Sequence, residues 1–217
     1  MQTEILLAVD AESIHRALEI LRKGGLVAFP TDTVYGLGAL AFDGKAVESI
    51  YLAKDRPIEK SIPVLIGDNT DLEKLSADIS DIVRRLVSRF WPGPLTVIVP
   101  KKPTLPESVS ATATVGVRVP DHPVARKLLR DAGPMAVTSA NISGQPSPAT
   151  AQEVFDQLSG RIELIIDGSK TPGGVPSTLV DCTGSEFKVL REGPITLEQI
   201  LSAIGENSND TFNRGSD

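Results

Sequence analysis

Three pairs of polar side chains, each pair two residues apart, could act together on one ligand. They stand beside short apolar runs and are Thr31 with Thr33 after VAFP, Lys54 with Arg56 before Pro57, and Ser139 with Asn141 after MAVT. Residues two apart in an extended chain point to the same side. Each pair can therefore present both side chains at a strand end, where α/β sheets commonly bind ligands.

The chemistry that these pairs offer is phosphate binding. A Lys-x-Arg pair sets two cations against a polyphosphate, and Ser and Asn can donate hydrogen bonds to phosphate oxygens. Pro57 favours an extended Arg56 and predicts that the preceding helix ends there. Spacing alone leaves a simpler explanation open, and it is the commoner one: a solvated Lys-Arg loop and a turn formed by Ser and Asn.

Three further residues carry a weaker signal. In VGVRVP, Arg118 shares one face of a predicted strand with Gly116, and that face either meets solvent or lines a cleft. Arg191 ends the run KVLR and would serve equally well in a surface ion pair. Ser177, after GGVP, fits a simple turn before a strand as well as a ligand contact.

These residues need a layered scaffold to bring them together, and the apolar pattern supplies one. Short apolar runs predict strands over residues 5–9, 26–29, 62–66, 95–99, 115–119, 135–138, 163–166, 178–182 and 187–191. Helical periodicity predicts a helix capped by Asp10, helices over 46–54, 78–90 and 122–132, and two more with capping boxes at Thr150 and Thr196. Strands that alternate with helices predict an α/β (α+β) domain and leave its topology open.

Composition excludes several classes of protein. The 217 residues fit one compact domain, and 22 Lys and Arg against 28 Asp and Glu give a net charge of −6, unlike a binder that holds nucleic acid by bulk charge. One cysteine excludes an intramolecular disulfide, and with two histidines it cannot form a structural zinc site. We therefore interpret Cys182 and His122 as structural.

The ends of the chain and its apolar runs predict its location. The N-terminal MQTEILLAVDAE carries an acid before its apolar run, unlike a signal peptide. No apolar stretch approaches the ~20 residues of a membrane span. We expect a soluble, cytoplasmic protein with one domain over residues 1–205 and a disordered polar tail over 206–217.

Several familiar catalytic motifs are missing from the sequence. It contains no G-x-x-x-x-G-K-[ST] phosphate loop, no G-x-G-x-x-G after a strand and no G-x-S-x-G elbow. His15 lies inside a predicted helix, a poor place for the base of a catalytic triad. An enzyme built on this sequence would work by positioning and electrostatics rather than through a covalent nucleophile.

The order of the motifs is more informative than any one of them. The segments PTDTVYGLG, AKDRP, WPGPLT, VGVRVPDHP, TSANISGQPSP, STLVD and REGP follow one another along the chain. Together they resemble the YrdC/TsaC family of L-threonylcarbamoyladenylate synthases, from about Ile14 to Ile204. Because the chain ends soon after REGP, it resembles the short form, in which residues 1–205 are a single catalytic domain.

The resemblance implies a fold and a reaction. The fold is a twisted mixed sheet flanked by helices, with a large concave, positively charged cavity. In the reaction, L-threonine, bicarbonate and ATP give threonylcarbamoyl-AMP and pyrophosphate, with Mg2+ accompanying ATP and no metal bound by the protein. The product then passes to threonylcarbamoyl-transferase proteins that modify adenosine in tRNA.

The resemblance also implies roles for residues in the matching motifs. On the threonine side it places Thr31, Thr33, Arg118 and Ser177, with Arg118 on the carboxylate. On the ATP side it places Lys54, Arg56, Thr114, Ser139, Asn141, Ser147 and Arg191, and it makes Lys54 and Arg56 the catalytic pair. It assigns no role to Lys60.

We hypothesise that the amine of threonine captures CO2 from bicarbonate as a carbamate, whose oxygen attacks the α-phosphorus of ATP. Lys54, Arg56 and a phosphate-bound Mg2+ would meet the charge on the α-phosphate and the departing pyrophosphate. The planar fork of Arg118 would orient the attacking group.

Two other functions stay open at this point. One is a non-catalytic module that binds double-stranded RNA or tRNA, for which the basic helical residues are Arg84, Arg85, Arg89, Arg126, Lys127 and Arg130. The net charge and the 4% aromatic content argue against it, and steep salt dependence of RNA binding would favour it. The other is an enzyme that adenylates carbamoyl phosphate, but the larger proteins of that kind carry zinc segments that this chain lacks.

Overall fold

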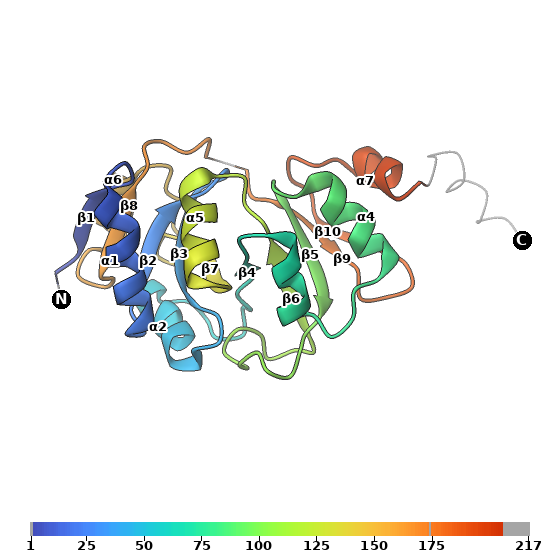
Figure 1. Ribbon diagram of the computed structural model, residues 1–217, viewed down its shortest axis with the longest axis horizontal. Coiled ribbons are helices and arrows are strands. Elements are labelled where there is room, and N and C mark those ends of the chain that lie inside the picture. The colour runs from blue at the N-terminus through green and yellow to red at the C-terminus, as the bar shows by residue number, and fades with distance from the viewer. Residues whose placement is uncertain (1, 174, 206–217) are drawn as a thin grey trace, which may run out of the picture.

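The computed structural model describes residues 2–173 and 175–205, and it shows one mixed sheet flanked by helices (Figure 1). The strands are β1 (Glu4–Leu7), β2 (Val27–Pro30), β3 (Tyr35–Leu40), β4 (Val64–Leu65), β5 (Leu95–Pro100), β6 (Thr114–Arg118), β7 (Met135–Ser139), β8 (Leu164–Asp167), β9 (Thr178–Asp181) and β10 (Lys188–Arg191). The helices are α1 (Ala11–Arg22), α2 (Gly44–Lys54), α3 (Leu72–Leu75), α4 (Asp81–Phe90), α5 (Pro123–Ala132), α6 (Ala151–Leu158) and α7 (Leu197–Ile204), with a 3-10 turn at Asn69–Asp71. The expected tail over 206–217 lies outside the described residues.

The strand order is β1-β8-β2-β3-β7-β4-β6-β5-β9-β10. Four neighbouring pairs run parallel, namely β1–β8, β2–β8, β4–β6 and β5–β9, and the other pairs are antiparallel. The expected mixed sheet flanked by helices is confirmed. Its centre brings the ends of β2, β7, β6 and β9 together, although these strands are far apart in the sequence.

At α2, α4, α6 and α7, a side chain at the start of the helix accepts a hydrogen bond from a free backbone N–H group of the first turn. Thr196 and Gln199 form the expected capping box, each side chain accepting from the backbone of the other. At α6, Thr150 accepts from the Glu153 N–H as expected, but the Glu153 carboxylate accepts from Ala149, so the box is not closed. Asp10 precedes α1 without capping it through its side chain, which corrects that expectation.

The sequence pattern missed strand β3 because two glycines interrupt it. A Cβ at Gly36 would lie 2.7 Å from Val137 Cγ1, and one at Gly38 would lie 2.8 Å from Met135 Cε. Strand β7, which carries both neighbours, pairs with β3 across these glycines. The glycines thus make room for the side chains of β7, although glycine is a poor strand former.

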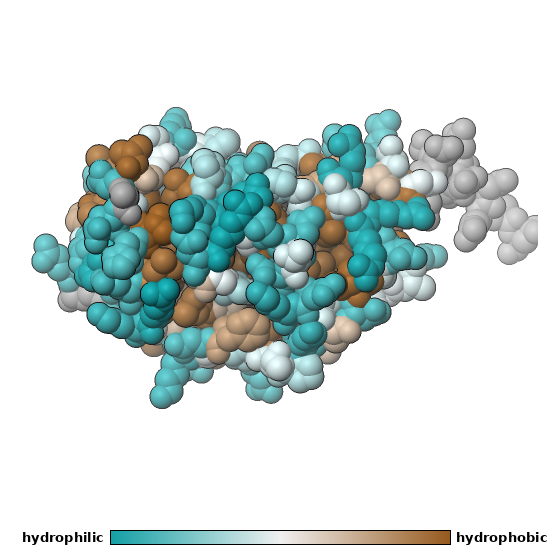
Figure 2. Space-filling view, viewed as in Figure 1, coloured by the Kyte–Doolittle hydropathy of each residue, from teal (hydrophilic) through white to brown (hydrophobic). Residues whose placement is uncertain are grey.

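The core lies on both faces of the sheet. Helices α1 and α5 pack with their apolar faces on one cluster around Phe29, Leu128 and Ile166, while α2, α4, α6 and α7 cover a larger cluster on the sheet. Figure 2 shows mostly hydrophilic side chains over the helices that face the viewer in Figure 1, with apolar side chains visible between them. The two-sided covering leaves the strand ends as the place where polar side chains can gather.

No helix in the described part of the chain is both long enough and apolar enough to cross a membrane.

Candidate active site

A cavity of about 560 Å3 opens where the central strands end. Most of the predicted site residues line it, and these are Thr31, Thr33, Arg56, Arg118, Ser139, Ser147, Ser177 and Arg191. Apolar side chains such as Ile98, Val137 and Leu179 complete the wall. The fold therefore brings together residues that are up to 160 positions apart in the sequence.

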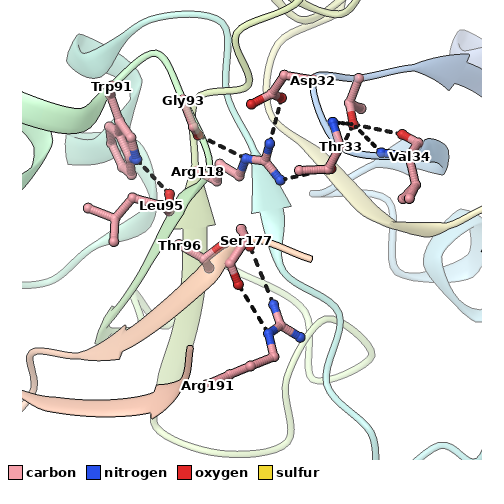
Figure 3. A network of polar contacts seen from close by, with 11 residues as sticks. Asp32, Thr33, Val34, Trp91, Gly93, Leu95, Thr96, Arg118, Ser177 and Arg191 are labelled. Atoms are coloured by element: carbon pink, nitrogen blue, oxygen red, sulfur yellow. Dashed lines mark hydrogen bonds and ion pairs between the residues drawn. The ribbon is translucent and has the colours of Figure 1, made fainter. Parts of the chain in front are cut away.

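Arg118 is fixed by three hydrogen bonds at the end of β6 (Figure 3). Its Nε donates to the Gly93 carbonyl oxygen (3.0 Å), its Nη1 to Thr33 Oγ1 (3.3 Å) and its Nη2 to Asp32 Oδ1 (2.5 Å). A guanidinium has five N–H donors, so two remain for a ligand. Because Gly116 on the same face also lines the cavity, this face of the strand lines a cleft rather than meeting solvent.

The threonine pair of the PTDT segment is held by its own loop. The Thr31 hydroxyl donates to the Val34 carbonyl oxygen (2.7 Å), so the 3.0 Å contact between Thr31 Oγ1 and Thr33 Oγ1 must be donated by Thr33. Thr33 then accepts from Arg118. Both threonines are buried, and their hydroxyl protons are used within the loop. Thr31 Oγ1 also accepts from the backbone N–H groups of Thr33 and Val34, so within the pair only Thr33 Oγ1 has a lone pair left for a ligand donor.

Ser177 and Arg191 meet on the other wall. Arg191 Nε donates to the Ser177 carbonyl oxygen (3.1 Å), and its Nη2 donates to Ser177 Oγ (3.3 Å). Thr96 Oγ1 lies 2.8 Å from Ser177 Oγ. The alternative of a surface ion pair for Arg191 is wrong, because no carboxylate within the described ranges pairs with it.

Of the Lys-x-Arg pair, Arg56 lines the cavity and Lys54 lies behind it. Lys54 is the last residue of α2 and is only 1% exposed, and its Nζ donates to the carbonyl oxygens of Ser139 and Asn141. Since Asp55 takes a left-handed conformation (φ 50), the pair is not extended and its two side chains diverge. Burial, helped by the charge of Arg56, lowers the pKa of Lys54 to about 7.

Arg56 is anchored from its own loop. Its Nε donates to the Lys60 carbonyl oxygen (3.2 Å) and its Nη2 to the Ser61 carbonyl oxygen (3.0 Å). Partial burial lowers its pKa, but a guanidinium stays charged at neutral pH. Arg56 therefore brings a positive charge to the rim of the cavity.

Asn141 and Thr114 lie outside the cavity lining. The Asn141 amide donates to the carbonyl oxygens of Ile142 and Gln145 (2.8 Å each), which shapes the loop that carries Ser139 and Ser147. Its Oδ1 is buried with no partner among the described residues. Thr114 Oγ1 lies 3.1 Å from Thr112 Oγ1 at the start of β6. Their predicted roles in nucleotide binding stay predictions.

The electrostatics of the cavity favour an anionic ligand. Three arginines line it, Arg56, Arg118 and Arg191, whereas no Asp or Glu among the described residues does. Burial lowers the pKa of Arg191, and repulsion by the positive charge of Arg118 lowers it further. Among residues 2–173 and 175–205, no group of three His, Cys, Asp or Glu side chains is placed to hold a metal ion.

Two side chains of the site were missed by sequence reasoning. Asp32 is the counter-ion of Arg118, and the available signal was its place between two predicted threonine ligands. Thr96 lines the cavity beside Ser177, and its signal was its place at the end of the motif WPGPLT. The same motif is held together at its start, where the Trp91 indole donates to the Leu95 carbonyl oxygen (2.8 Å).

The basic helical residues differ between α5 and α4. On α5, Arg126 and Arg130 both pair with Asp68, and Lys127 pairs with Asp131, which favours a solvated, ion-paired face there. On α4, Arg85 donates to the Ile204 carbonyl oxygen, and no carboxylate in the described residues pairs with Arg84 or Arg89.

Comparison with known proteins gives a family. The family model Sua5_yciO_yrdC, described as "Telomere recombination", matches residues 19–193. A Bacillus subtilis protein named threonylcarbamoyl-AMP synthase is 45% identical over 92% of this chain and 58% of its own length. A Mycobacterium tuberculosis protein named putative threonylcarbamoyl-AMP synthase is 40% identical over 97% of this chain and 99% of its own.

A solved structure has the same fold. The crystal structure of P. abyssi Sua5 complexed with L-threonine superimposes with a TM-score of 0.90 at 41% identity, covering 99% of this chain and 65% of that one. The chain thus spans about three fifths of the B. subtilis protein and 65% of the P. abyssi chain. The family model matches residues 19–193, and the M. tuberculosis relative is 40% identical over nearly the whole of both chains. The chain therefore belongs to the Sua5/YciO/YrdC family.

Proposed function

We propose that this protein is an L-threonylcarbamoyladenylate synthase, which makes threonylcarbamoyl-AMP and pyrophosphate from L-threonine, bicarbonate and ATP. The observation that carries the proposal is the cavity lined by three arginines, of which only Arg118 faces a carboxylate in the described residues. All three substrates are anions or carry anionic groups, so such a cavity suits them. The names of the relatives and the L-threonine complex of the P. abyssi protein support the same reaction.

Within the cavity, the amino acid belongs beside Arg118. Arg118 has one N–H group on each terminal nitrogen without a partner among the described residues, and these two groups can donate to a carboxylate. Thr33 and Ser177 flank this arginine and would contact the rest of the amino acid. The substrate amine would then point into the cavity rather than toward the wall.

ATP belongs toward Arg56, Ser139 and Ser147, which line the same cavity. Lys54 would act from behind, since its ammonium holds the carbonyl oxygens of Ser139 and Asn141 and so sets the loop that meets the phosphates. Mg2+ would enter as MgATP, bound by the phosphates, because none of the described residues that line the cavity carries a carboxylate to hold it.

The chemical sequence needs no nucleophile from the protein. The threonine nitrogen forms a bond to the carbon of bicarbonate-derived CO2 and loses a proton, which gives a carbamate. A carbamate oxygen then forms a bond to the α-phosphorus, the bond to the bridging oxygen breaks, and pyrophosphate leaves with Mg2+. Arg118 and Arg56 would hold the two reactants in line, as phosphoryl-transfer chemistry requires.

The proposal extends to the setting of the reaction. Residues 1–205 would form a single catalytic domain in the cytoplasm, and the mixed anhydride would pass to transferase proteins that act on tRNA. The cationic cavity is a local feature of a chain whose net charge is −6. Any contact with tRNA would therefore depend on the arginines that line the cavity and not on the net charge of the protein.

The test is pyrophosphate release by the purified protein with MgATP, in the presence and absence of L-threonine and of bicarbonate. Release that requires both co-substrates supports the proposal. Pyrophosphate release at the same rate with and without L-threonine would contradict it. Absence of turnover in a folded sample, together with salt-sensitive binding of RNA, would also contradict it.

A further inference from the structure

Thr96 and Ser177 form a buried pair of hydroxyls in the wall of the cavity. Both residues line the cavity, they are 4% and 5% exposed, and their oxygens lie 2.8 Å apart (Figure 3). Thr96 Oγ1 has no other hydrogen-bond partner in the described part of the chain. The pair faces the same space as Arg118, the group in the cavity best suited to a carboxylate.

The side chain of Thr96 is held in one orientation. Its methyl group leans over the neighbouring strand, where a Cβ at Gly116 would lie only 3.2 Å from Thr96 Cγ2. Strand β5 pairs with β9 in parallel, with Thr96 opposite Leu179, so the hydroxyl is directed at the residue that precedes β9. A β-branched side chain in a strand has little freedom at χ1, and this packing removes what remains.

Ser177 is fixed from the opposite side. Arg191 holds both its carbonyl oxygen (3.1 Å) and its Oγ (3.3 Å), and the next residue, Thr178, donates its N–H to the Pro94 carbonyl oxygen (2.9 Å). Gly193 packs so closely that a Cβ there would lie 2.4 Å from Thr178 N. The position of Ser177 Oγ is thus set by the backbone, and only the direction of its proton is left to choose.

The number of protons decides what this pair can do. Two hydroxyls carry two protons, one of which lies between the oxygens, and Ser177 Oγ also accepts from Arg191. If Thr96 donates to Ser177, both lone pairs of Ser177 Oγ are occupied and its proton is free for an acceptor in the cavity that Ser177 lines. If Ser177 donates to Thr96, the free proton belongs to Thr96 instead.

We propose that Thr96 is a positioning residue, which donates to Ser177 and thereby aims the Ser177 hydroxyl proton at an acceptor oxygen of the amino-acid substrate. This inference rests on the proposed function and deepens it, because it names the group that sets the hydrogen bond from Ser177. Thr96 itself touches no reacting atom. Its contribution is the preorganisation of a single donor beside Arg118.

The test is a double-mutant cycle on the Michaelis constants. Thr96→Val has nearly the shape of threonine and removes only the hydroxyl, and we expect it to raise the KM for L-threonine roughly 3- to 10-fold, the effect of one neutral hydrogen bond. The KM for ATP and kcat should change less than about twofold, because the lost interaction orients the amino acid alone. Thr96→Ser keeps the donor and should return the KM for threonine toward that of the unmodified protein.

The second arm of the cycle separates an indirect from a direct role. Ser177→Ala should raise the KM for threonine by itself, and Thr96→Val added to it should change that KM by less than about twofold, because its effect needs the Ser177 hydroxyl. A further full rise in the double variant would mean that Thr96 contacts the ligand directly, which overturns the proposal. An unchanged KM in Thr96→Val alone, or failure of Thr96→Ser to restore it, would also overturn it.

Thermal unfolding of each variant shows whether the fold survives. Turnover by the unmodified protein distinguishes failure of the proposed function from failure of the inference about Thr96. If the unmodified protein turns over and Thr96→Val has the same kinetic constants, only the inference about Thr96 is wrong. If the unmodified protein neither turns over nor binds L-threonine, the proposed function is wrong and the inference with it.

Discussion

Asp32 Oδ1 and Arg118 Nη2 lie 2.5 Å apart, and this ion pair joins the PTDT loop to the end of β6. The two side chains are 13% and 7% exposed, so the pair is largely shielded from water. It compensates the charge of Arg118 and, with the bonds to Gly93 and Thr33, sets the plane of the guanidinium. Asp32 thus helps to hold the Arg118 guanidinium in one orientation at the wall of the cavity.

Replacing Asp32 by asparagine should destabilise the protein. The loss leaves a shielded guanidinium without its counter-ion, and we expect the free energy of unfolding to fall by about 2 kcal/mol, less than the roughly 3–5 kcal/mol of a fully buried pair because the cavity admits water. Urea unfolding measures this change. Asp55→Asn is the matched control, since its partner Arg161 is 43% exposed and such pairs contribute about 0–1 kcal/mol. Equal losses in the two variants would contradict the structural role of Asp32.

Arg56→Ala should reduce turnover far more than it reduces stability. In the part of the chain that the structure describes, Arg56 bonds only to carbonyl oxygens of its own loop, at Lys60 and Ser61, so its loss removes little of the fold. If it meets charge on the phosphates, kcat should fall on the order of 100-fold, as for other electrostatic groups of an active site. Steady-state kinetics and thermal unfolding test this together, with Arg84→Ala on the exposed face of α4 as control. Product formation at the normal rate by Arg56→Ala would contradict the assignment.

Lys54 should make stability depend on pH. Its pKa is about 7 in the folded protein against a usual value of 10.5, so between these values the unfolded chain binds more protons. Deprotonation of Lys54 in the folded protein therefore increases the free energy of unfolding as the pH rises above about 7, by up to about 1.4 kcal/mol per pH unit. Below about pH 7 the amine is charged in both states, and the full cost of burying that charge remains.

Urea unfolding at a series of values between about pH 7 and pH 8.5 measures this dependence. In Lys54→Met the rise should be absent or much flatter, because no other group with a resolved shift has its folded pKa in that window. If the free energy of unfolding depends on pH with the same slope in Lys54→Met and in the unmodified protein, Lys54 stays charged between the carbonyl oxygens of Ser139 and Asn141.

Gly193→Ala should displace the wall that carries Ser177. The added Cβ would lie 2.4 Å from Thr178 N and 2.5 Å from the Pro176 carbonyl oxygen, and backbone atoms cannot move aside as a flexible side chain can. We expect a loss of about 1–3 kcal/mol in stability, the usual cost of overpacking. Gly184→Ala meets its nearest atom only at 3.4 Å and should be nearly neutral. Similar thermal unfolding temperatures for the two variants would show that the REGP turn yields easily.

Periodicity predicted most elements because each amphipathic helix and buried strand carries its own local signal. The 3-10 turn at Asn69–Asp71, the single-turn helix α3 and strand β3 were missed. Strand β3 is stabilised by the fit of Gly36 and Gly38 against Val137 and Met135, and that fit depends on strand β7, about 100 residues later. The sheet order was out of reach for the same reason. It depends on pairings between segments that no local pattern connects.

For the site, motif order predicted the candidate residues, and the structure shows how these residues differ in position. Lys54 and Arg56 are two apart, yet one is enclosed behind the Ser139 loop and the other lines the cavity, because Asp55 turns the chain between them. Two further side chains, Asp32 beside Arg118 and Thr96 beside Ser177, could be identified only from the structure, because each contact joins segments that are far apart in the sequence.

The most direct test of the proposed reaction follows the carbon of bicarbonate. The purified protein would be given MgATP, L-threonine and isotopically labelled bicarbonate, and the nucleotide products would be identified by mass spectrometry within seconds of mixing. The account predicts an AMP adduct that contains threonine and the labelled carbon, formed together with one equivalent of pyrophosphate. An unlabelled adduct, or hydrolysis of ATP to ADP with no adduct, would contradict it.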